Sequence, residues 1–175
     1  YFAKQAGSKP KADFVDVKNG TTRPETPGAP FDGEDVPLRP QTWIAKGRVE
    51  ELAASRYWAA KTGRQPTGQH TLVRLGGGAA ASVDDLVRGT KRGLLVTRFW
   101  YTRMLEPETV TLTGLTRDGV FLVENGRVTT PVNNFRYNES PVNVLRNVEA
   151  MTKDTTRVPI GGGVWHMPAL RTREF

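Results

Sequence analysis

The 175-residue chain contains no cysteine and only two histidines, His70 and His166. The absence of cysteine excludes disulfides, iron–sulfur clusters and thiolate zinc sites, and it is compatible with a reducing cytosol. A catalytic zinc usually takes three protein ligands from His, Cys, Asp or Glu, and no His-Glu-x-x-His or similar pair occurs. Any catalytic metal would therefore be held largely by residues outside this chain.

Long apolar runs are also missing. No stretch approaches the ~20 residues that cross a bilayer, and the first four residues lack the charged-then-apolar order of a signal peptide. We therefore expect a cytoplasmic protein with no membrane partner. Because the chain begins at Tyr1 without methionine, we also expect it to be a fragment of a longer protein.

Basic residues exceed acidic ones, 25 against 18, which gives a net charge of +7. A nucleic-acid surface needs clustered Lys and Arg. Here the basic clusters are short, and acidic side chains such as Asp84, Asp85 and Glu106 interrupt them. Nucleic-acid binding is therefore not expected as the primary function. A basic, non-enzymatic binding module stays open as the alternative class.

Residues 1–40 differ from the rest of the chain because they contain six prolines and only one short alternating run, residues 14–17. This spacing forbids a long helix and permits at most an edge strand. We therefore predict an extended arm or linker over residues 1–40, leading from a missing upstream domain, and a β-rich domain over residues 41–175.

The predicted domain is a series of short strands. Turn residues separate β-favouring runs at 42–52 (a hairpin), 71–75, 94–101, 109–113, 119–123 and 127–132, and Pro168 interrupts a last strand over 164–175. The run 94–101 is predicted to be the central strand. Asn125 and Gly126 supply the positive φ angles of a tight hairpin turn between the last two runs before residue 133.

Two short helices are predicted from their caps, besides one helical turn over residues 56–61. Ser82 begins the first helix and Gly93 ends it, while Ser140 begins the second, which extends to about Met151. The predicted fold class is α+β, a strand-dominated antiparallel sheet domain with two short helices and a Pro-rich N-terminal arm.

Two familiar chemical motifs are weak in this sequence. GGGAAA at residues 76–81 fits the Gly-x-Gly-x-x-Ala pattern of dinucleotide folds, but Asp84 and Asp85 place negative charge where a pyrophosphate needs bare N–H groups. A flexible connector is the better account. His70 and His166 have no paired partners, and no Gly-x-Ser-x-Gly elbow exists. No catalytic or metal-ligating residue is therefore predicted in this chain.

Aromatic and basic side chains alternate along residues 98–103. In a strand, the even-numbered side chains share one face and the odd-numbered side chains share the other. One aromatic face is expected to pack against the core, while the other could line a groove for an extended peptide. A strand covered on both faces is the alternative.

The predicted substrate-binding residues are Arg98, Trp100, Tyr101 and Arg117. Arg98 or Arg117 would receive a substrate carbonyl or carboxylate, and Trp100 or Tyr101 would supply a flat apolar wall. Residues 117–119, Arg-Asp-Gly, are most simply a turn that leaves Arg117 exposed.

Eight phrases of the sequence together resemble the C-terminal domain of the TldD/PmbA family of metallopeptidases, whose members are also described as proposed modulators of DNA gyrase. The phrases run in the family's order from residue 29 onwards: APFDGE (29–34), PTG (66–68), GLLVTRFWY (93–101), TGLTRDGVF (113–121), ENGR (124–127), FRYNES (135–140), NVEA (147–150) and MPAL (167–170).

The resemblance implies a cytosolic zinc peptidase that acts on small or unfolded peptides and assembles as a homodimer, or as a heterodimer with a related subunit. In that family a His-Glu-x-x-x-His helix upstream of the matched part holds the zinc, and its glutamate activates water. Members of the best-known type add a cysteine ligand shortly before a segment like residues 158–161. This chain has neither feature. Either the intact protein uses another third ligand, or it is a metal-free partner subunit, or this chain is its non-catalytic part.

Overall fold

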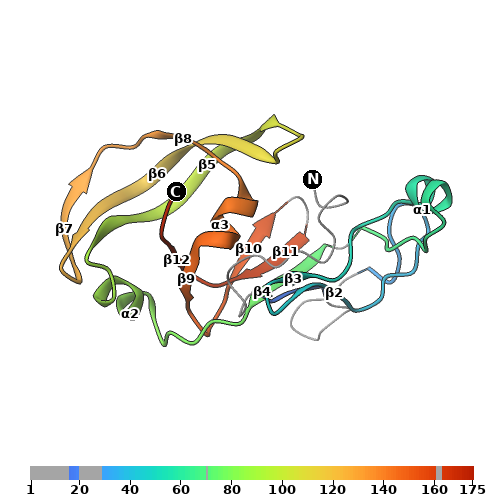
Figure 1. Ribbon diagram of the computed structural model, residues 1–175, viewed down its shortest axis with the longest axis horizontal. Helices are drawn as coiled ribbons and strands as arrows, with labels where there is room; N and C mark the ends of the chain where they lie inside the picture. Colours follow the sequence, from blue (N-terminus) through green and yellow to red (C-terminus); the bar gives the residue numbers. More distant parts are fainter. Residues whose placement is uncertain (1–15, 20–28, 70, 161–162) are drawn as a thin grey trace. The chain divides into compact units, whose positions relative to one another are not determined.

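The computed structural model describes residues 16–19, 29–69, 71–160 and 163–175, and Figure 1 shows their elements coloured in chain order. These residues fall into two compact units. The six-stranded unit holds the described residues of Phe2–Gly78 and Asp154–Pro168, and the four-stranded unit holds Ala79–Lys153 and Ala169–Phe175. No helix within the described ranges is long and apolar enough to span a membrane.

The sheet of the six-stranded unit has the order β10-β11-β4-β1-β2-β3. All neighbours pair antiparallel except β11 and β4, which are parallel. The strands are β1 (Asp16–Asn19), β2 (Gln41–Ala45), β3 (Arg48–Val49), β4 (Leu72–Gly76), β10 (Thr156–Ile160) and β11 (Gly163–Met167). The strand-dominated α+β class is confirmed, with one parallel pair in an otherwise antiparallel sheet.

β1 lies between β2 and β4 and pairs with both. The expectation of at most an edge strand in the Pro-rich part of the chain is therefore wrong. The reason is local, because residues 16–19 contain no proline and can donate on both sides. Residues 1–15 and 20–28 of the predicted arm lie outside the described residues.

Three short helices occur in the described residues: α1 (Arg56–Thr62), α2 (Val83–Arg88) and α3 (Pro141–Asn147). Their predicted starts are confirmed, and Ser82 and Ser140 cap α2 and α3. The predicted ends of α2 and α3 are wrong, because tertiary pairing stops both helices. The Thr90 and Lys91 carbonyls after α2 accept the Gly126 and Asn125 N–H groups of a hairpin turn.

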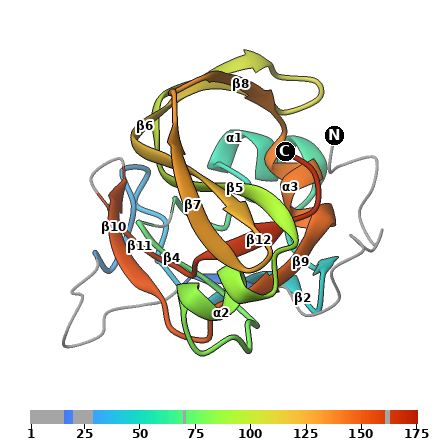
Figure 2. The same cartoon turned by 90° about the vertical axis from the view of Figure 1, so that its left-hand side faces the viewer.

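The residues after α3 form a strand instead of continuing the helix. β9 (Val148–Met151) pairs antiparallel with β12 (Leu170–Thr172). The last predicted strand is thus divided as expected, because Pro168 follows β11 and β12 begins two residues later. Figure 2 shows α2, β9 and β12 in a second view.

The larger sheet of the four-stranded unit contains β5 (Arg92–Glu106), β6 (Thr111–Glu124), β7 (Arg127–Val132) and β8 (Arg136–Glu139). β6 pairs with the other three strands, so β6 is central and β5 lies at the edge. The prediction of a central strand at 94–101 is therefore wrong. The predicted β6–β7 hairpin is confirmed, with φ angles of 50° at Asn125 and 77° at Gly126.

Each unit has a small core. Val120, Val123, Val142 and Met151 are buried in the four-stranded unit. The large apolar side chains of β5 are not, since the following are 40 to 59% exposed: Leu94, Phe99, Trp100, Tyr101, Met104 and Leu105. Neither a core-packed aromatic face nor a strand covered on both faces is observed. β5 therefore carries the most exposed apolar surface of this sheet.

Candidate functional site

The outer edge of β5 pairs with no other described strand, because β6 occupies its inner edge. The backbone of β5 has no positive φ angle over residues 92–100, and the single register shift there, between Val96 and Arg98, comes from an extra residue on the β6 side. Tyr101 then has a φ of 54°, and the register with β6 shifts after Trp100 and again after Met104. An extended peptide could therefore pair with about the first nine residues of β5 by main-chain hydrogen bonds.

The pairing register assigns the β5 side chains to faces. Directly opposite residues share a face, and successive residues alternate. Arg98 lies opposite Arg117, and Trp100 lies opposite Leu115. These four side chains share one face, which we call the arginine face. Phe99 lies opposite Thr116 on the other face, which we call the aromatic face.

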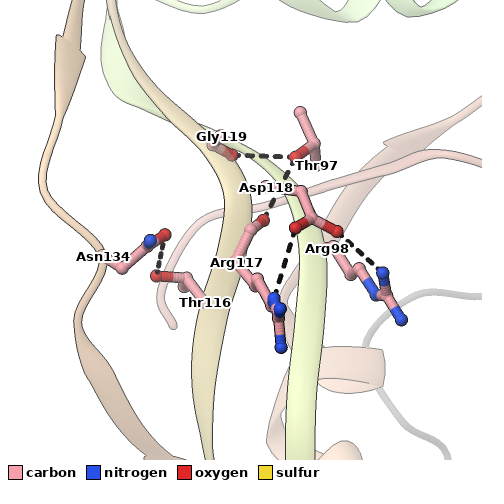
Figure 3. A network of polar contacts seen from close by, with 7 residues as sticks. All are labelled: Thr97, Arg98, Thr116, Arg117, Asp118, Gly119 and Asn134. Atoms are coloured by element: carbon pink, nitrogen blue, oxygen red, sulfur yellow. Dashed lines mark hydrogen bonds and ion pairs between the residues drawn. The ribbon is translucent and has the colours of Figure 1, made fainter.

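Three of the four predicted substrate-binding residues meet on the arginine face. The Cζ atoms of Arg98 and Arg117 lie 4.7 and 4.6 Å from the centre of the Trp100 ring. Asp118 orients both guanidinium groups, with its Oδ2 2.8 Å from Arg98 Nη1 and its Oδ1 3.4 Å from Arg117 Nε (Figure 3). Stacking uses the flat side of a guanidinium and leaves its remaining edge N–H groups available to an oxygen ligand.

The fourth predicted residue, Tyr101, is not part of this group. Its ring lies 4.1 Å from Arg103 Cζ, and the Arg103 guanidinium donates to its hydroxyl. The positive φ of Tyr101 interrupts the alternation that would have placed it on the Phe99 face and Thr102 on the Trp100 face. Thr102 instead contacts Tyr137, which also contacts Phe99. The simple even-odd division of 98–103 is therefore wrong beyond Trp100.

The predicted turn at residues 117–119 is a bulge inside β6. Asp118 and Gly119 have φ angles of 65° and 146°, and the β5–β6 register shifts between Val96 and Arg98. The Thr97 hydroxyl donates to the Gly119 and Arg117 carbonyls, at 2.9 and 3.3 Å, and so fastens the bulge to β5 (Figure 3). The turn residues were recognised, but β6 continues through them. The bulge carries the Asp118 carboxylate that orients Arg98.

The aromatic face holds a cluster that sequence reasoning missed. Phe99 contacts Tyr137 of β8 and Phe175, with ring centres 5.0 and 5.1 Å apart. The exposed aromatic residues were visible in the sequence. Their contact was not visible in the sequence, because Phe99 and Phe175 lie far apart along the chain.

A sequence model of the PmbA/TldA metallopeptidase C-terminal domain matches residues 1–175, the whole chain. The chain belongs to this family. No curated protein matches it. Among solved structures, TldE from Thermococcus kodakarensis superposes with a TM-score of 0.82 at 19% identity, over 98% of this chain and 41% of that protein.

Two further solved structures are similar to this TldD/PmbA domain. A proposed modulator of DNA gyrase from Bacteroides thetaiotaomicron has a TM-score of 0.80 at 22% identity, over 97% of this chain and 38% of its own. Another, from Thermotoga maritima, has a TM-score of 0.75 at 18% identity, over 95% and 39%. The chain thus spans about two fifths of the length of these proteins, and at such identities the likeness shows the fold.

The side chains of this TldD/PmbA domain do not fit a zinc site within the described residues. No three His, Cys, Asp or Glu side chains gather there. His166 lies in β11 between Arg157 of β10 and Arg74 of β4, so its cross-strand neighbours are cations instead of carboxylates. His70 lies outside the described residues. No step of a zinc reaction is therefore assigned to these residues.

The segment 76–81 joins the two units, whose division falls after Gly78, but it is not flexible throughout, since Gly76 ends β4 and Ala80 pairs with Met151 and Lys153. Ser82 donates its hydroxyl to the Asp85 carboxylate and accepts from the Asp85 N–H. The Ser82 hydroxyl, and then Arg88, hold the pKa of Asp85 below its usual value. The start of α2 is thus occupied by groups of the chain itself, as the connector interpretation requires.

A cavity lies among the described residues of the six-stranded unit. Its volume is about 430 Å³, and it is lined by Ala29, Phe31, Asp32, Gly33, Leu38, Gln69, Thr71, Ile160 and Trp165. The Asp32 carboxylate accepts backbone N–H groups of Val36, Gln69 and Glu34. These bonds, first that of Val36, hold the pKa of Asp32 below its usual value. Asp32 therefore shapes the cavity wall by closing a loop.

Proposed function

We propose that this chain is the substrate-side and assembly domain of a TldD/PmbA-like zinc-dependent peptidase that acts on small or unfolded peptides. The observation that carries the proposal is the family match over all 175 residues, under the description of a metallopeptidase C-terminal domain. In this proposal the zinc and the water-activating glutamate belong to the upstream part of the intact, cytoplasmic protein. This domain binds the peptide and contributes to a homodimer, or to a heterodimer with a related subunit.

The geometry of β5 supports a peptide as the substrate. An open strand edge offers alternating N–H and C=O groups, which any extended peptide can pair with regardless of sequence. The arginine face beside this edge offers N–H donors from Arg98 and Arg117 and an apolar plane from Trp100. Such groups suit a substrate carbonyl or carboxylate next to an apolar side chain.

The test is hydrolysis of casein and short peptides by the purified intact protein, with its zinc content measured. We expect cleavage that a chelator abolishes and added zinc restores, because the chemistry needs a metal-activated water. Intact protein that holds zinc and cleaves no peptide would contradict the proposal. Intact protein without zinc, which cleaves only after its related subunit is added, would identify the metal-free partner subunit.

The runner-up is a non-enzymatic module that touches nucleic acid. It draws on the net charge of +7 and on the two similar structures described as proposed modulators of DNA gyrase. We expect only weak, sequence-independent binding of duplex DNA at physiological salt, because the basic residues are dispersed. Sub-micromolar affinity at that salt would favour the runner-up.

A further inference from the structure

The aromatic face of the sheet carries a built site whose occupant is a residue of the same chain. We propose that Phe99, Tyr137 and the backbone of Gly114 form a cradle for one aromatic side chain of a bound peptide, and that Phe175 fills this cradle in the structure. The inference deepens the proposed function, since it rests on a peptide being the ligand. It adds the class of side chain that the peptide presents.

The three rings contact one another in pairs. The Phe175 ring stacks on Phe99 with centres 5.1 Å apart and 30° between planes, and its centre lies 5.4 Å from that of Tyr137. Phe99 and Tyr137 meet edge to face at 5.0 Å and 69°. All three separations fall in the range that aromatic pairs prefer. The two walls of the cradle thus have different orientations, and a third ring lies against both of them.

Gly114 makes room for the Tyr137 wall. A Cβ atom on Gly114 would lie 2.5 Å from the Tyr137 hydroxyl oxygen and 2.7 Å from two of its ring atoms. The Tyr137 ring therefore lies directly on the backbone of β6, in space that any other residue would fill. The Tyr137 and Thr102 hydroxyl oxygens, 2.6 Å apart, share a hydrogen bond that fixes the far end of the ring.

The occupant is held less firmly than the walls. Polar contacts anchor the segment after β12 up to Glu174. The Arg173 N–H donates to the Asn147 carbonyl and its guanidinium binds Glu149 at 3.0 Å, while the Glu174 carbonyl accepts from the Thr172 hydroxyl at 3.1 Å. Phe175 follows with ring contacts, and its side chain is 47% exposed. The ring can therefore leave while β12 stays paired with β9. An aromatic ring of a bound peptide would then make the same two contacts, with Phe99 and with Tyr137.

The cradle lies where a peptide on β5 would present a side chain. A strand added to the outer edge of β5 would run about 4.8 Å from it and would direct alternate side chains to each face. Phe99 lies within residues 92–100, where the backbone of β5 has no positive φ angle. One side chain of the peptide would thus lie beside the cradle, while its neighbours lie towards the arginine face.

The experiment measures binding to the intact protein by calorimetry. The probes are two capped hexapeptides that differ only in a central phenylalanine or alanine. Phe175→Ala removes the occupant, so we expect the phenylalanine peptide to bind roughly three- to tenfold tighter, and the alanine peptide to bind as before. Phe175→Leu, which keeps apolar cover over β5, guards against loss of folding and should give a smaller gain in the same direction.

Two variants test the walls of the cradle. Tyr137→Leu removes one ring, and Gly114→Ala displaces that ring without removing it. Both should abolish the preference for phenylalanine over alanine. Gly76→Ala is the matched control, because nothing lies within 4 Å of a Cβ at that position, and it should keep the preference.

Three results would overturn the inference: no preference for phenylalanine in any variant, no binding of either peptide, or an equal effect of Phe175→Ala on both peptides. The last result would mean that the cluster only holds the segment after β12 against the sheet. Hydrolysis is followed in parallel. Phenylalanine preference without any cleavage would leave the cradle in place and contradict the proposed peptidase function instead.

Discussion

The two faces of the β5–β6 sheet hold their side chains by different forces. On the arginine face, Arg98 and Arg117 are fixed by one carboxylate and one indole ring, and their side chains are each 50% exposed. On the aromatic face, rings lie on a glycine backbone and on one another. Charge-based contacts weaken in salt and ring contacts do not. Under the proposed function, successive residues of one strand would therefore serve two kinds of recognition, one for polar backbone groups and one for a side chain.

The largest effect is expected on the aromatic face. Gly114→Ala should lower the free energy of unfolding by about 2 kcal/mol, because the added Cβ overlaps Tyr137 and forces its ring off the sheet. Urea denaturation of this variant and of Gly76→Ala would measure it. If both substitutions cost the same, the close approach of Tyr137 to Gly114 has no energetic role.

The next effect concerns function on the arginine face. In the intact protein, Arg98→Ala should lower peptide turnover about tenfold, since the lost donor positions the substrate without building the core. Folding and zinc content should not change. Arg127→Ala, an exposed arginine of β7, is the control. Unchanged turnover with Arg98→Ala, or loss of soluble protein, would place the groove elsewhere.

A smaller effect separates the faces by salt. Asp118→Asn keeps a residue that tolerates a φ of 65° and removes the charge that orients Arg98 and Arg117. The substitution should lower the free energy of unfolding by about 0.5 kcal/mol at low salt and leave it unchanged at 1 M salt. Phe99→Leu should lower the free energy of unfolding by the same amount at both salt concentrations. Equal salt dependence of the two variants would remove the distinction between the faces.

The smallest effect is expected in acid, at a carboxylate outside both faces. The Ser82 hydroxyl and Arg88 lower the pKa of Asp85 from 3.8. The contribution of the Asp85 carboxylate to the free energy of unfolding is therefore complete above pH 3.8 and is lost as the pH falls through the folded-state pKa. Asp85→Asn should flatten the fall in stability below about pH 4. The unchanged protein, which keeps the Asp85 carboxylate, is the reference. Urea midpoints from pH 2 to 6 would show the difference.

Local chemistry made part of this fold predictable. Asn125 and Gly126 specify a turn by their backbone preferences, and Ser82 and Ser140 specify helix starts by their side chains. The same local logic failed at Asp118, whose positive φ is compatible with a bulge as well as a turn. The end of α2 depends on a distant contact. The carbonyls that follow the helix accept hydrogen bonds from a turn some thirty-five residues later, and no local sequence pattern encodes this pairing.

The candidate site was predictable to a similar extent. The exposed run around Arg98 and Trp100 was found from its alternating chemistry, and the structure joins Arg117 to it through the β5–β6 register. The edge position of β5 depends on strand order, which follows from long-range pairing. Tyr137 was missed because its ring comes to lie on Gly114 only through the pairing of β8 with β6, which the sequence does not show. The substrate roles of these residues stay predictions.

The irregular backbone at Tyr101 also bears on self-association. An open edge of fifteen regular residues would be a template for other copies of the chain, and edge-to-edge pairing of that kind leads to aggregates. The positive φ at Tyr101 ends the extended backbone of β5 after Trp100, and the β5–β6 register shifts after Trp100 and once more after Met104. Under the proposed function this edge would accept one short guest strand, while the described outer edge of β5 offers no long flat stretch on which fibrils could grow.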